Sequence, residues 1–198
     1  RRAWMILSVV VNLGMLAYFK YGTFALENFQ ALMATFGVEY KPPGFDIVLP
    51  VGISFYTFAT LSYTLDVYLR RAAPARNFLD YALFVTFFPH LVAGPIMRPT
   101  ELVPQFAEAR RASADQLRFG LALITLGLFQ KIVLADSFLS RPAEMVYDGQ
   151  KIPGVVDAWV ATLAFSGQIF CDFAGYSTTA IGVAMCLGFE MPDNFRFP

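Results

Sequence analysis

Two oppositely charged side chains lie within the most apolar stretches of this sequence. Lys131 lies in the run Leu117–Leu139, and Asp172 lies near the middle of Val155–Phe189. A charged side chain at the centre of a membrane helix costs roughly 2.5–3.5 kcal/mol on insertion scales. We therefore expect Asp172 to point into the protein and to meet a cationic or polar partner, with Lys131 as the first candidate.

Two interpretations of this charge pair are open. One is a structural polar clamp, in which Lys131 neutralises Asp172 across two helices, or neutralises Asp136 on its own segment. The other is a polar tunnel through the protein. The tunnel would be lined by Asp172 and its polar neighbours, which are Gln168, Tyr176 and Ser177.

The only histidine, His90, lies in the stretch "FFPHLVAGPIMRP", residues 87–99. Histidine is the usual base at neutral pH because its ordinary pKa is near 6.5. However, no serine or cysteine lies close to His90 in sequence with a convincing base arrangement, and one histidine cannot make a metal site. A hydrogen-bonded structural role is therefore favoured for His90. We expect no catalytic residue and no metal site in this sequence.

The stretch around His90 is also broken by Pro89, Gly94 and Pro95. Irregular backbone survives at membrane depth only inside protein or along a water-filled cavity. Basic segments flank the stretch at 70–76 and 98–118, and basic loops mark the cytoplasmic side. We therefore predict that residues 87–98 do not form one continuous crossing helix but dip into the membrane and return.

The composition points to a membrane protein. Hydrophobic residues make up 57% of the 198 and charged residues only 15%, whereas a soluble domain carries roughly 25% charged residues. The 15 basic and 15 acidic residues cancel, so nothing indicates a nucleic-acid partner. The lipid bilayer is the partner that the composition predicts.

Segment lengths predict an all-α integral membrane fold, a multi-helix bundle with broken, re-entrant and interfacial helices around a tunnel. Residues 1–198 would form part of a single polytopic domain that is incomplete at both ends. The predicted membrane spans are Ala3–Phe19, Ile47–Leu69 with Pro50 in its first turn, and Leu117–Leu139. Two further helices are predicted within Val155–Phe189, and they meet at "CDFAGYS". The segments between them are predicted to be an interfacial helix at Tyr21–Gly37, a turn at Tyr40–Asp46, a polar loop at Arg98–Arg118 and a polar connection at Ser140–Gly154.

Four stretches in this order carry a family resemblance. They are "LPVGISFYTFATLSYTLDVYLR", "FFPHLVAGPIMRPTELVPQF", "LGLFQKIVLAD" and "QIFCDFAGYSTTAIGVAMCLGFEMPDNFRFP". Together the sequence resembles the membrane-bound O-acyltransferases, and within them the bacterial branch that O-acetylates alginate. The resemblance covers nearly the whole chain.

The resemblance implies a multi-pass protein of the bacterial inner membrane. It would transfer acetyl from a cytoplasmic donor, acetyl-CoA or another acyl thioester, towards hydroxyls of an exported polysaccharide such as alginate, with no bound cofactor. An extracytoplasmic acetyltransferase of the same machinery is the implied partner protein. The donor's phosphates would suit a cytoplasmic mouth that contains Arg98, Arg110 and Arg111.

The family's catalytic histidine lies in a tryptophan–histidine motif beyond the "DNF" segment, and His90 is not in that motif. We therefore expect this chain to be an inactive piece of a longer enzyme. A transporter or channel component is the alternative, because broken helices with an intramembrane Asp172 and Lys131 also suit one. No inverted repeat relates the two halves of the sequence. A tryptophan–histidine pair downstream would favour the enzyme.

Overall fold

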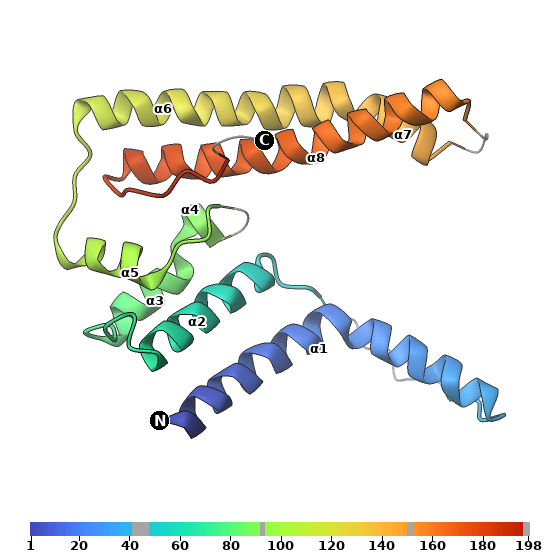
Figure 1. Ribbon diagram of the computed structural model, residues 1–198, viewed down its shortest axis with the longest axis horizontal. Coiled ribbons are helices and arrows are strands. Elements are labelled where there is room, and N and C mark those ends of the chain that lie inside the picture. The colour runs from blue at the N-terminus through green and yellow to red at the C-terminus, as the bar shows by residue number, and fades with distance from the viewer. Residues whose placement is uncertain (41–47, 92–93, 150–152, 196–198) are drawn as a thin grey trace. The chain divides into compact units, whose positions relative to one another are not determined.

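The computed structural model describes residues 1–40, 48–91, 94–149 and 153–195, and within these ranges it is helical without β-strands (Figure 1). The chain divides into two compact units. The first comprises Arg1–Thr86 with Arg98–Thr100, and the second comprises Phe87–Met97 with Glu101–Pro198. Among the described residues, three helices are long and apolar enough to cross a membrane, and these are Arg2–Thr35, Ala114–Tyr147 and Val155–Cys186. The prediction of an all-α membrane fold is thus confirmed.

The first unit begins with one long helix, α1 (Arg2–Thr35), which bends partway along its length (Figure 1). Because the helix is continuous, the predicted end of the first span at Phe19 is wrong, whereas the interfacial position of the second half stays a prediction. Polar residues such as Glu27 and Asn28 lowered the hydropathy of the second half but did not interrupt the backbone. No proline occurs between residues 2 and 35, so the helical hydrogen bonds continue through this region.

Helix α2 (Ile53–Tyr68) starts later than predicted, because Gly52 before it has a left-handed φ of 76°. Its 16 residues measure about 24 Å, which is short of the roughly 30 Å hydrocarbon layer. The predicted 23-residue span is therefore wrong, and most of the turn predicted before it lies outside the described residues. Helices α1 and α2 pack together, with Ser8 Oγ 3.1 Å from Thr64 Oγ1.

The stretch around His90 is broken, as predicted. Helix α3 (Phe78–Thr86) ends before Phe87, helix α4 (Phe88–Leu91) has four residues, and residues 94–98 are not helical. Gly94, Pro95 and Met97 are buried while Ile96 is 71% exposed, so part of this irregular backbone is enclosed by protein, which favours it at membrane depth. The dip of this stretch into the membrane and its return stay a prediction.

The segment after Arg98 is more ordered than the predicted polar loop. It forms α5 (Pro99–Leu102) and the 3-10 helix η1 (Val103–Ala107). Helix α6 (Ala114–Leu128) then begins with a capping box, in which the side chains of Ser113 and Gln116 each accept a backbone N–H of the other residue. This reciprocal pair satisfies backbone donors at the helix start and fixes where α6 begins.

Helix α6 continues without interruption into the π-helix η2 (Phe129–Leu139) and α7 (Ser140–Tyr147). The polar connection predicted from Ser140 is therefore wrong in its first half. Helix α8 (Val155–Cys186) is one helix of 32 residues, so the predicted break at "CDFAGYS" is also wrong. In Figure 1, α8 runs beside the α6–α7 rod.

Two pairs of glycines explain the close contact between α6 and α8. A Cβ built on Gly127 would lie 2.6 Å from the carbonyl oxygen of Gly175, and a Cβ on Gly120 would lie 2.7 Å from that of Gly182. The reverse approaches, from α8 to α6, are 2.7 and 2.6 Å respectively. Gly175 therefore marks a backbone-to-backbone contact, the usual role of small residues between membrane helices, and not a helix end.

We predict that Gly127→Ala destabilises the full-length protein by about 1–3 kcal/mol, because the added methyl group meets backbone atoms that cannot move aside. Gly14→Ala on α1 is the matched control. A Cβ at Gly14 has nothing within 4 Å, so this change should be neutral or stabilise by up to about 1 kcal/mol through helix propensity. Unfolding of the purified protein in detergent measures both. Equal stability of the two variants would contradict the glycine contact.

Candidate functional site

A cluster of three charged side chains connects η2 with α8. Lys131 Nζ lies 2.8 Å from Asp136 Oδ1 and 2.5 Å from Asp172 Oδ1. The same ammonium group lies 5.4 Å from the ring centroid of Tyr176. The expected ion pair between Lys131 and Asp172 is present, and Asp136 is its third member. This cluster is the candidate site.

The π-helical geometry of η2 accounts for the pair within it. Lys131 and Asp136 are five residues apart, whereas side chains on an α-helix meet at three or four. A π-helix bonds each residue to one five positions away, which brings these two side chains together. Ser137 follows the same spacing, since its Oγ donates to the Ile132 carbonyl at 2.7 Å.

The glycine contact accounts for the pair between helices. A Cβ at Gly175 would lie 2.9 Å from Lys131 N and 3.1 Å from Lys131 Cβ. Because position 175 has no side chain, the backbone at Lys131 reaches α8 directly. Asp172 lies one turn before Gly175 on α8, within reach of the Lys131 ammonium group.

The cluster is only partly enclosed. The exposed side-chain fractions are 25% for Lys131, 47% for Asp136 and 41% for Asp172, so Asp172 is less buried than predicted. One ammonium group between two carboxylates offsets part of their charge, which lowers the cost of placing them in a membrane helix. No nucleophile and base pair occurs in the cluster, so its geometry is that of a clamp that holds η2 against α8.

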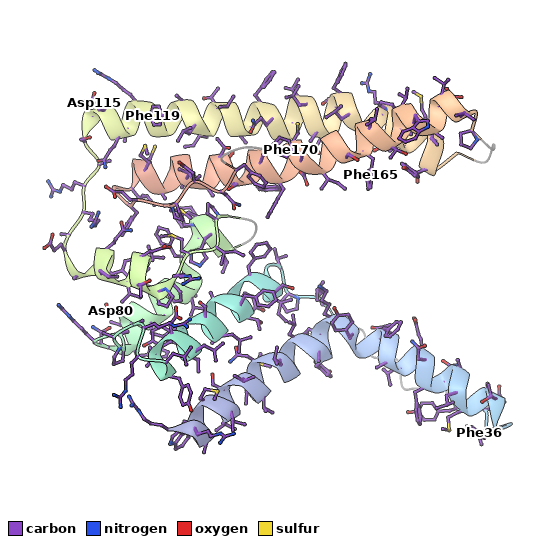
Figure 2. The ribbon with its side chains drawn as sticks, viewed as in Figure 1. Phe36, Asp80, Asp115, Phe119, Phe165 and Phe170 are labelled. Carbon is purple, nitrogen blue, oxygen red and sulfur yellow. The ribbon has the colours of Figure 1, made fainter. Side chains whose placement is uncertain are left out.

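Gln168 lies one turn before Asp172 but lines a different feature. It contributes to a pocket of about 240 Å³ between α7 and α8. Tyr147 and Phe165 form an aromatic pair in that pocket with ring centroids 5.5 Å apart, and Figure 2 labels Phe165 on α8. A polar tunnel that includes Gln168, Asp172 and Tyr176 stays a prediction.

His90 is in a different environment, on α4, which packs against α8. It is 4% exposed, and its ring centroid lies 5.9 Å from that of Phe87. Phe87 in turn contacts the rings of Phe106 and Phe189, with centroids 6.0 and 5.2 Å away. Burial lowers the pKa of His90 to about 4, so the imidazole is neutral near pH 7. An uncharged histidine in an aromatic cluster fits a structural role.

The three arginines suggested for donor binding are divided between the units. Arg98 belongs to the first unit, and Arg110 and Arg111 belong to the second. Arg110 Nε donates to the Gln105 carbonyl at 3.1 Å. Gln105 also exchanges two hydrogen bonds with the backbone of Glu190, at 2.9 and 3.0 Å. The segment before α6 is therefore fastened to the segment after α8, but a shared phosphate site stays a prediction.

Metal binding finds no support in the described part of the chain, where no group of three or more histidine, cysteine, aspartate or glutamate side chains is placed to hold an ion. Cys171 and Cys186 are free thiols.

Sequence reasoning missed two features that build the site. The π-helix η2 has no sequence signal that we recognise. The glycine contact does have one, because Gly120 and Gly127 are seven residues apart on α6, and Gly175 and Gly182 are seven apart on α8. Matching spacings of small residues on two apolar segments predict a shared helix interface.

The comparison with protein families decides which family this fold represents. Residues 70–198, more than half of the chain, match the model of MBOAT, the membrane-bound O-acyltransferase family. The chain belongs to this family. The resemblance inferred from the four sequence stretches is thereby confirmed.

Individual relatives agree with this assignment. The chain is 40% identical to the "Probable alginate O-acetylase AlgI" of Pseudomonas putida, over 98% of this chain and 39% of that protein. It is 32% identical to a peptidoglycan O-acetyltransferase of Helicobacter pylori, over 100% of this chain and 41% of that protein. It is 28% identical to a teichoic acid D-alanyltransferase of Bacillus subtilis, over 79% of this chain and 40% of that protein. The chain spans about two fifths of the length of these curated relatives.

The clamp in this MBOAT chain generates a stability prediction. Lys131→Met leaves Asp136 and Asp172 without their cation, which should cost roughly 2.5–3.5 kcal/mol, the scale of an uncompensated charge in a membrane helix. Adding Asp172→Asn should recover part of this loss. Folded yield and the unfolding midpoint of the full-length protein measure both effects.

Lys20→Met is the matched control, because Lys20 is an exposed lysine on α1 whose ammonium group lies 5.7 Å from the ring of Tyr21. It should change stability little. If Lys131→Met were as mild as Lys20→Met, the clamp would not contribute to the fold.

Proposed function

We propose that this chain is the front to middle part of a membrane O-acyltransferase that transfers acetyl from a cytoplasmic thioester donor towards hydroxyls of an exported polysaccharide such as alginate. The observation that supports this most is the 40% identity to an alginate O-acetylase across 98% of the chain. Acetyl-CoA is the proposed donor, and the bacterial inner membrane is the proposed location.

The reaction needs a base, and neither His90 nor Lys131 suits that role. A hydroxyl oxygen attacks the thioester carbonyl, its proton passes to a base, and the thiolate leaves as the new ester forms. His90 is buried among aromatic rings and Lys131 is held by two carboxylates. We assign the base to the histidine of the family's tryptophan–histidine motif, which the resemblance places after the "DNF" segment.

The residues of this chain then have supporting roles. Lys131 and Asp172 hold η2 against α8, and Tyr176 and Gln168 add polar groups on α8 to a proposed passage for the acyl group. Arg98, Arg110 and Arg111 would face the cytoplasm, where their guanidinium groups suit the phosphates of a coenzyme A donor. A separate extracytoplasmic acetyltransferase would take the acetyl group onwards.

Broken helices by themselves would also suit a transporter, which is the alternative class of protein. The family match gives this alternative no support. Vesicles that contain the full-length protein distinguish the two. An acyltransferase given acetyl-CoA outside and a hydroxyl acceptor inside should release free thiol and form ester in equal amounts. Movement of an intact solute without thiol release would contradict the proposal.

We predict that His90→Ala in the full-length protein retains substantial transfer, within about tenfold of wild type, while stability falls. The reason is that removing a buried ring leaves a cavity, and large-to-small changes at buried sites cost roughly 2–5 kcal/mol. The measurement is the acetyl content of the exported polymer, normalised to protein abundance. A folded and abundant His90→Ala protein without activity would show that the base was assigned to the wrong part of the enzyme.

A further inference from the structure

The first unit contains a pocket between the start of α1 and the end of α2. Its volume is about 260 Å³. Arg1 contributes a guanidinium group to its lining, and Trp4, Tyr63 and Tyr68 contribute aromatic rings. Met5 and Val67 add aliphatic surface. The pocket therefore combines one cation with an apolar and aromatic wall.

Contacts inside the first unit hold this wall in place. Thr64 lines the pocket and lies in hydrogen-bond contact with Ser8, which ties α2 to α1. The Tyr63 hydroxyl accepts the backbone N–H of Ala75 at 2.9 Å, and its ring centroid lies 4.8 Å from that of Tyr81. These contacts hold the α2 side of the pocket against α1 and the segment after α2.

The charge of the pocket is positive. Among the described residues no carboxylate pairs with Arg1. Arg2, Arg70 and Arg71 follow at the same two helix ends. Asp66 is a buried carboxylate on α2, but it is not part of the lining. An anionic group would therefore be attracted here.

The position of the pocket along the helices indicates the membrane–water interface. Tryptophan and tyrosine gather at that level, and arginine-rich ends mark the cytoplasmic side. Basic pockets between membrane helices on that side suit anionic lipid headgroups. The aliphatic surface of Met5 and Val67 suits the acyl chain of a lipid better than it suits a polar, soluble ligand.

We propose that this pocket binds the phosphate headgroup of an anionic phospholipid from the cytoplasmic leaflet. Arg1 donates charge-assisted hydrogen bonds to the phosphate. The indole N–H of Trp4 and the hydroxyl of Tyr68 are donors for the glycerol and ester oxygens. One acyl chain starts along Met5 and Val67. This site does not depend on the proposed acyl transfer.

The test compares lipid retention by the full-length protein in nanodiscs of phosphatidylcholine with and without phosphatidylglycerol. After mild delipidation, mass spectrometry counts the retained lipid. Wild type should retain phosphatidylglycerol over phosphatidylcholine. Arg1→Gln should lower that preference about fivefold, the effect of one arginine at a charged membrane surface, and Arg1→Lys should keep most of it.

Arg76→Gln is the matched control, because Arg76 is an exposed arginine that follows α2 but does not line the pocket. It should leave the preference unchanged. Equal losses in Arg1→Gln and Arg76→Gln would overturn the site in favour of diffuse surface charge. Equal retention of both lipids by wild type would also overturn it. Release of the lipid by coenzyme A at equal concentration would assign the pocket to a soluble phosphate ligand instead.

If Arg1→Gln does not fold, cross-linking of the unmutated protein tests the same site. A phosphatidylglycerol with a photoreactive group near its headgroup should cross-link to residues 1–5 or 63–68. Cross-links that map only to other parts of the chain would overturn the proposal.

Discussion

The backbone contact between α6 and α8 is the constraint on which the second unit depends. Four glycines, Gly120, Gly127, Gly175 and Gly182, let carbonyl groups of one helix touch the other. In a bilayer no hydrophobic force draws helices together, so such close packing is the main source of attraction. The Gly127–Gly175 contact brings the backbone at Lys131 against α8, and the ion pair between Lys131 and Asp172 occurs beside it.

The ion cluster and the broken stretch around His90 both lower the cost of polar groups in a membrane, but by different means. Charges and unpaired backbone groups are both expensive in lipid. The cluster offsets one of its two carboxylate charges with the ammonium group that lies between them. The stretch around His90 instead buries Gly94, Pro95 and Met97 inside the protein. The proposed acyl transfer across a membrane would use polar and irregular elements of this kind.

Features that depend on composition or on strong local signals were predictable from the sequence. The membrane class, the break caused by Pro89 and Pro95, and the partner of Asp172 could all be inferred from residue types. Helix boundaries were less predictable, because they depend on packing. Gly175 was interpreted as a helix end although the neighbouring helix makes it a contact point. The π-helix η2 was not foreseen. Lys131 and Asp136 are five residues apart, and this spacing alone does not show whether the two side chains meet or act separately.

A charge swap measures whether the ion pair between Lys131 and Asp172 joins the α6–η2 rod to α8. Lys131→Asp with Asp172→Lys keeps one cation and two carboxylates in the cluster. Lys131→Asp alone places three carboxylates together, and Asp172→Lys alone places two ammonium groups beside one carboxylate. The measurement is the unfolding midpoint of the full-length protein in the two single variants and the double variant. We expect each single change to lower the midpoint and the double variant to recover most of the loss. A double variant as unstable as the sum of the two single changes would contradict the ion pair.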